Sequence, residues 1–395
     1  MDEINVKIKK QYVSKYKNGY PIITKDSVLS MGTLDKEGQI IRLTDEKGGF
    51  IAKGYYGLQN KCIGWVLTTS KKASVNYKLF YDKIRNSILK REKFYYSKHT
   101  NAFRVFNGEG DGIGGLTIDY YNGYYLITWY SEGIYEYRDI VLKCIKSLVP
   151  FDGIYQKKRF EHNGMVVDED SFVCGKRNDK LIVIKENDVK FAIYLNDGAM
   201  TGIFLDQKDV RKSIKEKYSK GKKILNTFSY TGAFSVAAAT SEAYTTSVDL
   251  AKRSLPKTTE NFNLNKIDLK NQKIVVEDIF NFFKEAKNNN IKYDMVILDP
   301  PSFSNSKENT FSASRDYKDL LKLAVSITEN DGIIVASTNC STFNMNKFKV
   351  FIDDAMKEKD VQYEILEEHQ LPKDFSINTN YSESNYLKVV FIKLI

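Results

Sequence analysis

The sequence predicts an α/β protein with a small N-terminal β-barrel, a middle region of mixed α/β structure and a C-terminal doubly wound sheet of seven strands. Three observations support this prediction. The length of 395 residues suits two or three domains. Short apolar runs separated by turn signals fill the first part of the chain. Strand and helix patterns alternate along the last part.

The first two domains are expected at residues 1–72 and 73–190. In the first, turn signals such as Asn18–Gly19 separate the strand-like runs "YPIIT", "QIIRLT" and "FIAKGYY". The second begins with "YKLFYDKIRNSILKREKFYY", in which apolar residues return every three or four positions, as in a helix. An Asn122–Gly123 turn then predicts a hairpin between "GGLTIDYY" and "YYLITWY".

The third domain is expected at residues 191–395 and holds the strands of the predicted sheet. Helical patterns separate most of these strands, which is typical of parallel strands joined by crossover helices. The helical pattern "LAKRSLPKTTE" contains Pro256, so we expect its main helix to begin at Leu255 or Pro256. The predicted strands are 222–228, 244–250, 273–278, 293–300, 332–339, 363–371 and 386–395.

Composition narrows the class of protein. No apolar run reaches the length of a membrane span and the N-terminus lacks an apolar signal core, so we expect a cytoplasmic protein without membrane contact. The four cysteines lie far apart and the three histidines are scattered, which predicts neither a metal site nor a disulfide framework. A net charge of +10 suits a polyanionic partner.

Ligands of doubly wound sheets bind at the carboxyl ends of the strands, where several informative residues lie. The first strand runs into "NTFSYTGAFSVAA", whose single Gly232 allows a tight turn, and the absence of GxGxxG disfavours a dehydrogenase. The next two strands end at Asp249 and Asp278. Either carboxylate can bind a nucleoside, at the ribose hydroxyls or an adenine amino group, or can cap a helix. Together they favour a nucleoside-containing cofactor.

The fourth strand ends in "ILDPPSF", which is a more specific signal. Two consecutive prolines fix a rigid, extended corner directly after a buried strand. A plain turn would rarely need both Pro300 and Pro301. We therefore expect Asp299 to be held at the edge of the ligand cleft.

These motifs resemble those of a known family. "TGIFLDQ", "NTFSYTGAF", "SVDLAKRSL", "VVEDIF" and "DPPSF" are similar to the S-adenosylmethionine (SAM) binding motifs of class I methyltransferases, which have a Rossmann-like fold. Within that class the chain resembles the bacterial 23S ribosomal RNA large-subunit methyltransferases designated I, K and Q, and most of all the Q-type guanine-N7 enzyme. The start of the chain resembles their PUA domain, a small RNA-binding barrel, and "NGEGDGIGGLTIDYYNGYY" resembles their middle domain.

The resemblance implies SAM as the cofactor and 23S ribosomal RNA, or a large-subunit assembly intermediate, as the partner; a homodimer is compatible with it. It also implies roles for individual residues. Asp249 would hold the ribose and Asp278 the adenine amine, while Asp299 and the catalytic Pro300 would border the transferred methyl group. The other implied cofactor-binding residues are Phe204, Asp206, Gln207, Asn226, Phe228, Tyr230, Thr231, Gly232, Leu250 and Ile279.

The stretch from Lys78 to Lys98 has the composition of an RNA-binding surface. It holds seven basic and two acidic residues, interleaved with five aromatic residues. Basic side chains neutralise phosphates, and aromatic faces stack on unpaired bases. A second basic run, 208–223, is explained at least as well by a solvated helix face. The RNA-binding candidates are Lys78, Lys83, Arg85, Lys90, Arg91 and Lys93.

The segment "VASTNCSTF" bears on which base accepts the methyl group. Methylation of cytosine C5 needs a cysteine thiolate that adds to C6, whereas guanine N7 already has an exposed lone pair. In an ungapped comparison over residues 332–348, Asn339 takes the place of the cysteine in the I-type motif "TFSCS" and of the second Asn in the K-type motif "SNN". Cys340 comes one residue later, which in an extended segment turns a side chain to the opposite face. We therefore predict guanine-N7 methylation with Asn339 as a catalytic residue.

Three alternatives stay open at this point. A cytosine-C5 methyltransferase would use Cys340 as its nucleophile. A non-catalytic ribosome-assembly factor would keep the RNA-binding domains and would not bind SAM. A protein or small-molecule methyltransferase would leave the PUA-like start and the basic, aromatic stretch without a purpose.

Overall fold

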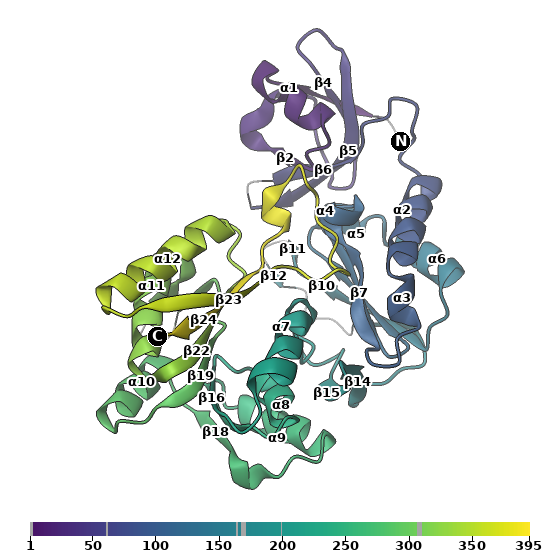
Figure 1. The fold of residues 1–395 in the computed structure, drawn as a ribbon. Helices are drawn as coiled ribbons and strands as arrows, with labels where there is room; N and C mark the ends of the chain where they lie inside the picture. The colour runs from purple at the N-terminus through teal and green to yellow at the C-terminus, as the bar shows by residue number, and fades with distance from the viewer. Residues whose placement is uncertain (1–2, 61, 163–164, 167–170, 199, 306–309) are drawn as a thin grey trace. The chain divides into compact units, whose positions relative to one another are not determined.

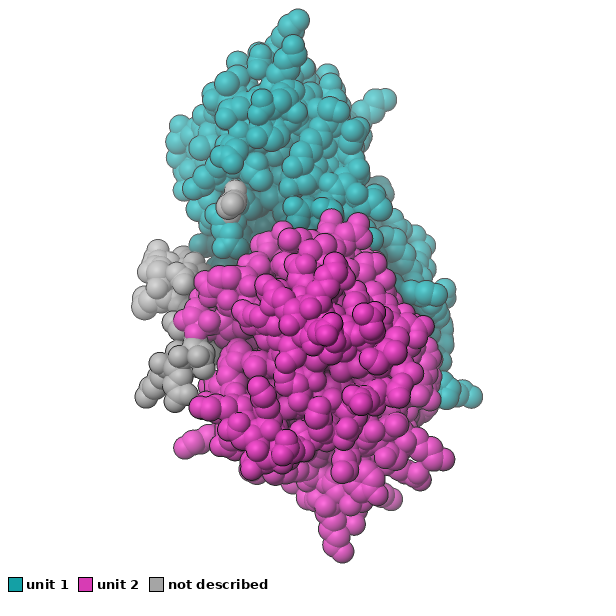
Figure 2. Space-filling view, turned by 60° about the vertical axis from the view of Figure 1, so that its left-hand side comes forward, with its two compact units in different colours: residues 1–182, 194–201, 373–384 teal, residues 183–193, 202–372, 385–395 magenta. Residues whose placement is uncertain are grey.

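The computed structural model describes residues 3–60, 62–162, 165–166, 171–198, 200–305 and 310–395 (Figure 1). The chain forms two compact units, which are coloured separately in Figure 2. Unit 1 consists of residues 1–182, 194–201 and 373–384, and unit 2 of residues 183–193, 202–372 and 385–395. The finer division into three domains remains a prediction.

Unit 1 begins with a six-stranded sheet. Its elements are β1 (Ile4–Ile8), α1 (Lys10–Lys17), β2 (Ile22–Thr24), a 3₁₀ turn (Lys25–Ser27), β3 (Val28–Met31), β4 (Ile40–Thr44), β5 (Phe50–Gln59) and β6 (Cys62–Thr68). The strand order is β2-β6-β5-β4-β1-β3, and all pairs are antiparallel except β1 with β4. Val6, Ile41 and Leu43, from neighbouring strands, are buried in one core. The small N-terminal β domain predicted from the sequence is thereby confirmed.

A second sheet of unit 1 has the strand order β13-β10-β9-β8-β7. Its elements are α2 (Tyr77–Lys90), α3 (Glu92–Tyr95), β7 (Ala102–Asn107), α4 (Gly108–Asp111), β8 (Leu116–Tyr121), β9 (Tyr124–Trp129), α5 (Glu132–Tyr135), α6 (Arg138–Leu148), β10 (Gly153–Lys158) and β13 (Phe172–Gly175), with a short β11 (Glu161–His162) and β12 (Met165–Val166). The predicted hairpin joins β8 to β9, with φ of 46° at Asn122 and 94° at Gly123, as in a type I′ turn. Trp65 of β6 shares a core with Phe103 and Ile127, so the two sheets of unit 1 are packed together.

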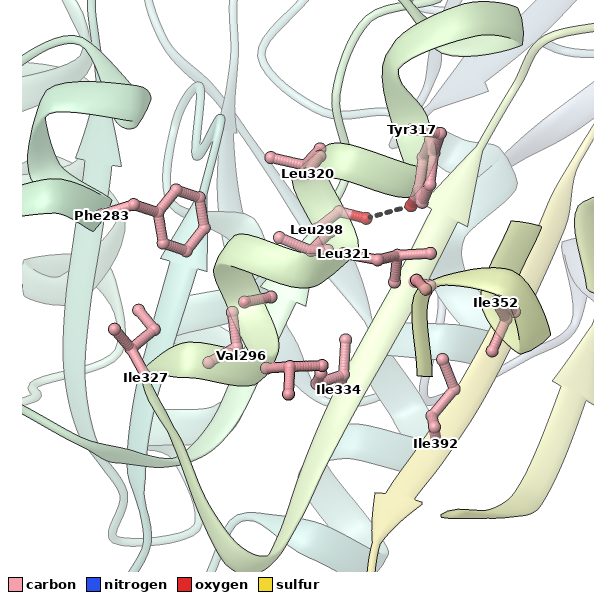
Figure 3. Close-up of a cluster of buried hydrophobic side chains, with 14 of the residues drawn as sticks. Phe283, Val296, Leu298, Tyr317, Leu320, Leu321, Ile327, Ile334, Ile352 and Ile392 are labelled. Atoms are coloured by element: carbon pink, nitrogen blue, oxygen red, sulfur yellow. Dashed lines mark hydrogen bonds between the residues drawn. The ribbon is translucent and has the colours of Figure 1, made fainter. Parts of the chain in front are cut away.

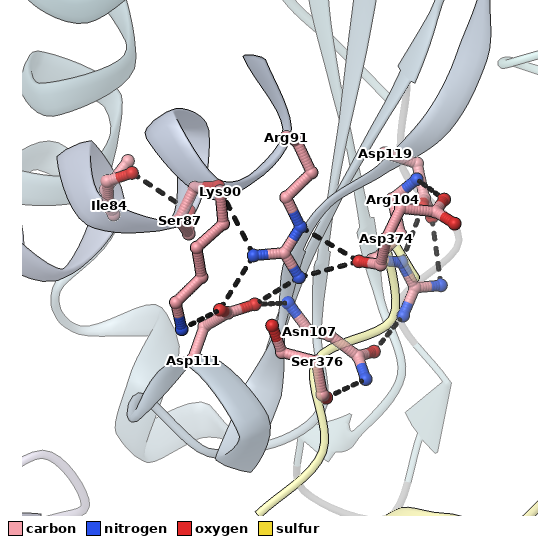
Figure 4. Close-up of polar contacts among 10 residues, drawn as sticks. All are labelled: Ile84, Ser87, Lys90, Arg91, Arg104, Asn107, Asp111, Asp119, Asp374 and Ser376. Carbon is pink, nitrogen blue, oxygen red and sulfur yellow. Dashed lines mark hydrogen bonds and ion pairs between the residues drawn. The ribbon is translucent and has the colours of Figure 1, made fainter. Parts of the chain in front are cut away.

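A buried ionic network in unit 1 holds a segment from near the end of the chain (Figure 4). Arg91 donates to both carboxylate oxygens of Asp111, at 2.8 and 2.7 Å. The same guanidinium donates to the backbone oxygen of Asp374, at 2.9 and 2.6 Å. The Asp374 carboxylate accepts the backbone N–H of Arg104 at 2.9 Å. Residues 373–384, which connect the last two strands of the unit 2 sheet, are therefore anchored in unit 1.

Unit 2 contains the predicted seven-stranded sheet. Its elements are β14 (Ile182–Glu186), β15 (Val189–Ile193), α7 (Lys208–Ser213), β16 (Lys223–Thr227), α8 (Ala233–Ala239), β17 (Tyr244–Asp249), α9 (Ser254–Leu264), β18 (Gln272–Val276), α10 (Ile279–Asn288), β19 (Tyr293–Leu298), β20 (Phe303–Asn305), β21 (Thr310–Ser312), α11 (Ala313–Ser326), β22 (Thr328–Thr338), α12 (Met345–Glu358), β23 (Tyr363–His369) and β24 (Lys388–Leu394), with 3₁₀ turns at Leu205–Gln207, Leu269–Asn271 and Ser382–Ser384 and a π-helical turn at Ile214–Tyr218. The order is β18-β17-β16-β19-β22-β24-β23, parallel except for β24. β22 begins at Thr328 rather than at Gly332, because Thr328 pairs with Tyr293.

Helices cover both faces of this sheet (Figure 1). Successive side chains of a strand point to opposite faces, so along β19 Met295 and Ile297 pack under α7 and α8, while Val296 and Leu298 pack under α10 and α11. Figure 3 shows the second of these cores. Pro256 lies in the first turn of α9, close to the predicted helix start, where its missing N–H breaks no helical hydrogen bond.

Candidate functional site

The carboxyl ends of the parallel strands lie at one edge of the unit 2 sheet, and a strained loop follows β16 there. Phe228, Tyr230 and Gly232 have φ of 51°, 53° and 70°. Positive φ at residues other than glycine costs conformational energy and is concentrated at ligand-binding sites. Gly232 is also tightly packed, because a Cβ there would lie 2.4 Å from Cγ2 of Thr258. Tertiary packing thus holds this loop in a conformation that its sequence alone would not favour.

Asp249, at the end of β17, is tied to the same loop. One carboxylate oxygen accepts the backbone N–H of Tyr230 at 2.7 Å, and the other accepts that of Ala251 at 2.8 Å. Burial raises the pKa of Asp249, and these two hydrogen bonds oppose that effect. Each oxygen keeps a second lone pair, so the carboxylate can hold the loop and still accept from a ligand hydroxyl.

Asp278 has the capping role that the sequence left open. It is the N-cap of α10, and its side chain accepts the backbone N–H groups of Phe280 at 2.9 Å and Asn281 at 3.4 Å. The side chain of the next residue, Ile279, is buried in the core of the sheet. Leu250, after β17, is 58% exposed. Of the predicted cofactor residues at these two strand ends, only Ile279 is therefore unable to offer its side chain to a ligand.

Asp299, which follows β19, is half-buried at the centre of a polar cluster. Its Oδ1 accepts from Oγ of Ser337 at 2.7 Å and from Nε2 of Gln207 at 3.1 Å. The same Nε2 lies 2.8 Å from Oγ of Ser337. Burial raises the pKa of Asp299 to about 6, and the nearby Asp206 carboxylate also raises it, against the hydrogen bond from Ser337. Pro300 is buried beside this cluster.

Asn339 and Cys340 face different environments at the end of β22. Asn339 is exposed, and its Oδ1 accepts from Oγ of Ser302 in the "DPPSF" segment at 2.6 Å. Cys340 is 7% exposed and belongs to the core under α11 and α12. Its Sγ lies 3.1 Å from Oγ1 of Thr342. The two neighbouring side chains therefore differ in exposure.

Several buried polar atoms at this edge of the sheet have no hydrogen-bond partner within the described part of the chain. They are Oδ1 of Asn226, Oε1 of Gln207 and Oγ of Ser229. Buried acceptors are rarely left unpaired in native proteins, and a bound ligand with donor groups would satisfy them. The ring of Phe204 is 41% exposed and lies 5.5 Å from that of Tyr230. A ligand with an ammonium group, hydroxyls and a flat ring fits this lining, and SAM is such a ligand.

Reasoning from the sequence missed four residues of this site: Ser302, Ser337, Tyr386 and Lys388. The hydroxyl of Tyr386 donates to the Asp206 carboxylate at 2.8 Å. Lys388 is buried next to Cys340, and burial lowers the pKa of this lysine to about 8. A weak signal existed for Ser337 and Lys388, because each directly adjoins the apolar run of a predicted strand. For Tyr386 and Ser302 we find no such signal.

The predicted RNA-binding candidates divide into two groups. Lys78, Arg85, Lys90 and Lys93 are exposed, and Lys83 is half-buried. Arg91 is fully buried in its ion pair with Asp111, so its assignment to RNA needs correction: the guanidinium is not accessible to a phosphate. The charge pattern could not show this, because a buried and an exposed arginine look alike in a basic helix.

Most aromatic residues of the same stretch are packed against other side chains of unit 1 and so have little free ring face for a base. Phe80 is buried, while Phe94 and Tyr95 pack on the ring of Phe103 at 5.5 and 4.8 Å. Tyr96 is 79% exposed. Among the aromatic residues between Lys78 and Lys98, it therefore presents the largest free face for stacking.

The described ranges contain neither a candidate metal centre nor a candidate membrane span. No group of three or more His, Cys, Asp or Glu side chains there is arranged to hold a metal ion. No helix in those ranges is both long and apolar enough to cross a membrane.

Comparison with known proteins agrees with this geometry. A family model described as "S-adenosylmethionine-dependent methyltransferase" matches residues 104–376, and one described as "PUA-like domain" matches residues 6–69. The Bacillus subtilis (strain 168) protein named "Putative ribosomal RNA large subunit methyltransferase YwbD" is 50% identical over 389 residues, 98% of each chain. "Ribosomal RNA large subunit methyltransferase I" of Escherichia coli (strain SMS-3-5 / SECEC) is 27% identical, over 93% of this chain and 94% of that one.

A solved structure is similar over almost the whole length. It is the crystal structure of "SMU.776, a putative methyltransferase complexed with SAH", where SAH is S-adenosylhomocysteine. Its TM-score is 0.90 at 37% identity, and the match covers 98% of this chain and 99% of that chain. The family match spans well over half of the sequence and includes every strand end described above. The chain therefore belongs to the S-adenosylmethionine-dependent methyltransferase family and carries a PUA-like domain at its N-terminus.

Proposed function

We propose that this protein transfers a methyl group from SAM to a base of 23S ribosomal RNA, and that the product is 7-methylguanosine. The names of the relatives, ribosomal RNA large subunit methyltransferases, support an RNA substrate. The PUA-like domain supports it independently. So does the exposed stretch in which Arg85, Lys90 and Lys93 accompany Tyr96, because it offers phosphate contacts beside a stacking face.

The cofactor residues proposed here are those at the strand ends. When bound, SAM supplies a reactive methyl group on a positively charged sulfur. The loop with Asn226, Phe228, Tyr230, Thr231 and Gly232 would surround its methionine part, together with Phe204, Asp206 and Gln207. Asp249 and Leu250 would lie at the ribose, and Asp278 at the adenine amine. Ile279 would contribute only backbone atoms, since its side chain is in the core.

The observation that carries the choice of base is the contrast between Asn339 and Cys340. Attack on C6 of cytosine requires a thiolate that reaches the base. Cys340 is buried in the core under α11 and α12, whereas Asn339 is exposed and accepts a hydrogen bond from Ser302 of the "DPPSF" segment. A buried thiol on the wrong face of the segment supports a reaction that needs no nucleophilic cysteine.

Guanine-N7 methylation fits the groups that are exposed. N7 has a lone pair and carries no proton, so the protein has to position the base and does not have to supply a general base. The edge of guanine next to N7 also presents the O6 acceptor. The amide group of Asn339 can donate to O6 and so orient N7 towards the methyl group, while its contact with Ser302 keeps the side chain in place.

Replacing Cys340 with alanine tests this proposal. The variant should keep at least about half of the wild-type activity on 23S ribosomal RNA, because the thiol takes no part in N7 chemistry. Nucleoside mass spectrometry should show 7-methylguanosine as the product, and this nucleoside should disappear from the RNA of a deletion strain. Cys144→Ala, which removes a buried thiol from unit 1, is the matched control for packing loss.

A cytosine-C5 methyltransferase is the second candidate, and one observation favours it. Lys388 is buried next to Cys340 with no carboxylate partner among the described residues, and an ammonium group stabilises a neighbouring thiolate. Loss of all turnover in a folded Cys340→Ala variant, with 5-methylcytidine missing from the deletion strain, would establish this chemistry in place of ours. A non-catalytic assembly factor would instead show no rise in thermal midpoint with SAM.

We further propose that the enzyme works in the cytoplasm, where ribosomes are assembled, on free 23S ribosomal RNA or an assembly intermediate. A homodimer is part of the same proposal. Light scattering of the purified protein measures its mass directly, and a monomer at micromolar concentration would remove the dimer from the proposal.

A further inference from the structure

The hairpin formed by β14 and β15 makes buried polar contacts to both proposed cofactor loops. In sequence it precedes the seven-stranded sheet and pairs only with itself among the described strands. Its first anchor is Glu186 at the end of β14, whose carboxylate accepts Nε and Nη2 of Arg211 at 2.7 and 2.9 Å. Both side chains are almost fully buried, at 1% and 3% exposure. The same Nη2 donates to the backbone oxygen of Phe204 at 2.7 Å.

The second anchor runs through α9. The backbone N–H of Ala192 in β15 donates to Oδ1 of Asn261 at 2.8 Å, and Nδ2 of Asn261 donates to the backbone oxygen of Thr231 at 2.9 Å. Oγ1 of Thr231 in turn donates to the backbone oxygen of Gly202 at 2.6 Å. Gly202 also packs closely against β15, because a Cβ at this position would lie 2.5 Å from the backbone oxygen of Ala192.

We infer that the β14–β15 hairpin is a clamp that sets the relative position of the two cofactor loops, with Arg211 and Asn261 as its positioning residues. One loop begins at Gly202 and includes Phe204; the other includes Thr231. The inference rests on the proposed assignment of these loops to SAM, and it names the parts of the fold that hold them ready before binding. Its physical basis is preorganisation: a loop that is already fixed loses little conformational entropy when the ligand binds.

The geometry distinguishes a clamp from ordinary packing. The guanidinium of Arg211 donates to both carboxylate oxygens of Glu186 and also to a backbone carbonyl in a cofactor loop. A lysine has a single nitrogen and could not make all three hydrogen bonds in this geometry. Asn261 bonds the hairpin with its oxygen and the other cofactor loop with its nitrogen. Each side chain therefore joins the same hairpin to a different loop.

The chain provides a matched control for Asn261. Asn265 is the C-cap of the same helix, one turn later, and bonds the same hairpin through the N–H and the oxygen of Lys190 at 2.9 and 2.7 Å. Its Nδ2 also donates to the backbone oxygen of Asn261 at 2.8 Å, which is a contact within the end of the helix. It has no hydrogen bond to either cofactor loop among the described contacts. Asn261→Ala should weaken SAH binding by about tenfold in calorimetry. Asn265→Ala should leave SAH affinity within about twofold of wild type.

Arg211 needs a different design, because removing one partner of a buried ion pair leaves an uncompensated charge and endangers folding. The double variant Glu186→Leu with Arg211→Met removes both charges together, which is often neutral for stability. It should keep a cooperative thermal transition and lose SAH affinity by about tenfold. Arg211→Lys, which keeps an ion pair but cannot also reach the backbone oxygen of Phe204, should bind SAH more weakly than wild type as well.

The outcomes separate this inference from the proposed function. If wild type binds SAH, and the folded Asn261→Ala and double variants bind it as tightly as Asn265→Ala, the clamp is refuted and the cofactor site stands. If wild type fails to bind SAH, the proposed function itself is refuted, independently of the clamp. If Asn261→Ala does not fold, the SAH affinity of the double variant is compared with that of Asn265→Ala, and this comparison decides.

Discussion

Asp299 combines burial with a second carboxylate close by, and the consequence is a pKa of about 6. Above that pH the carboxylate is ionised and attracts the positive sulfur of SAM; below it the carboxyl group is neutral. SAM affinity should therefore fall by about three- to tenfold as the pH drops from about 7 to 5.5. SAH carries no charge on sulfur, so its affinity should change much less. Calorimetry with both ligands across this range measures the difference.

Asp299→Asn is the control for this pH dependence. Because the folded-state pKa is raised, the native state prefers the neutral form, and stability from this group is present at low pH and lost as the pH rises through about 6. The amide resembles the neutral form, so the variant should fold. A pH profile for SAM that is unchanged in Asp299→Asn would show that another group is responsible.

Asp249 should be the residue on which cofactor binding depends most. In Asp249→Ala the loop loses the acceptor for the N–H of Tyr230, and the ligand loses the proposed ribose contact. We expect SAH affinity to fall by at least about tenfold in calorimetry. Asp294→Ala is the matched control, since that carboxylate accepts the backbone N–H of Lys223 at the opposite ends of the strands. Equal affinities in the two variants would contradict the assigned pocket.

At the scale of elements, α2 and α3 carry the proposed RNA contacts. Reversing the charges of Arg85 and Lys93 to Glu should weaken binding to 23S ribosomal RNA fragments and lower the slope of affinity against salt concentration by about two units, because each side chain neutralises roughly one phosphate. Filter binding at several salt concentrations provides the slope. The pair Lys273→Glu and Lys284→Glu, exposed on unit 2, changes net charge equally. The same loss of slope in that pair would show only a general charge effect.

The helix patterns of this stretch show why exposure had to come from the structure. A periodic basic helix predicts which residues share a face, and one face of α2 packs in the core of unit 1. Arg91, the residue that caps the end of this helix, forms a buried ion pair. The apolar period of α2 predicted the helix well. Whether Arg91 meets a phosphate or Asp111 depends on α4, which the helix pattern does not describe.

At the scale of the whole molecule, the Arg91 network ties residues 373–384 to the N-terminal half of the chain. Arg91→Met leaves the buried Asp111 carboxylate without its main partner. The variant should lose about 3–5 kcal/mol of stability. Urea unfolding of the full chain, followed by circular dichroism, measures this loss. Lys90→Met removes an exposed amine 3.4 Å from the same carboxylate and should cost less than about 1 kcal/mol.

If Arg91→Met were as stable as Lys90→Met, the network would not anchor the segment. RNA affinity gives a second readout. Arg91 is not accessible to a phosphate, so a folded Arg91→Met variant should keep the salt slope of wild type, in contrast to the Arg85 and Lys93 reversal.

The sequence by itself determined the fold class, the succession of seven strands along the C-terminal part of the chain, and the motifs that mark the family. These are local properties: apolar period, turn chemistry and proline corners are set by residues close together in the chain. Asp249, Asp278 and Asp299 could be found because each lies at the end of a predicted strand.

Only the tertiary structure decided which neighbours these residues meet. The pKa of Asp299 depends on Asp206, the anchoring of Phe204 on Glu186, and the burial of Arg91 on Asp374, and each pair is far apart in the sequence. Burial and hydrogen bonding are set by the packing of distant segments, so local patterns carry no record of them. The opposite environments of Asn339 and Cys340 follow from both: alternation along the chain separated their side chains, and the core under α11 and α12 fixed which of the two is buried.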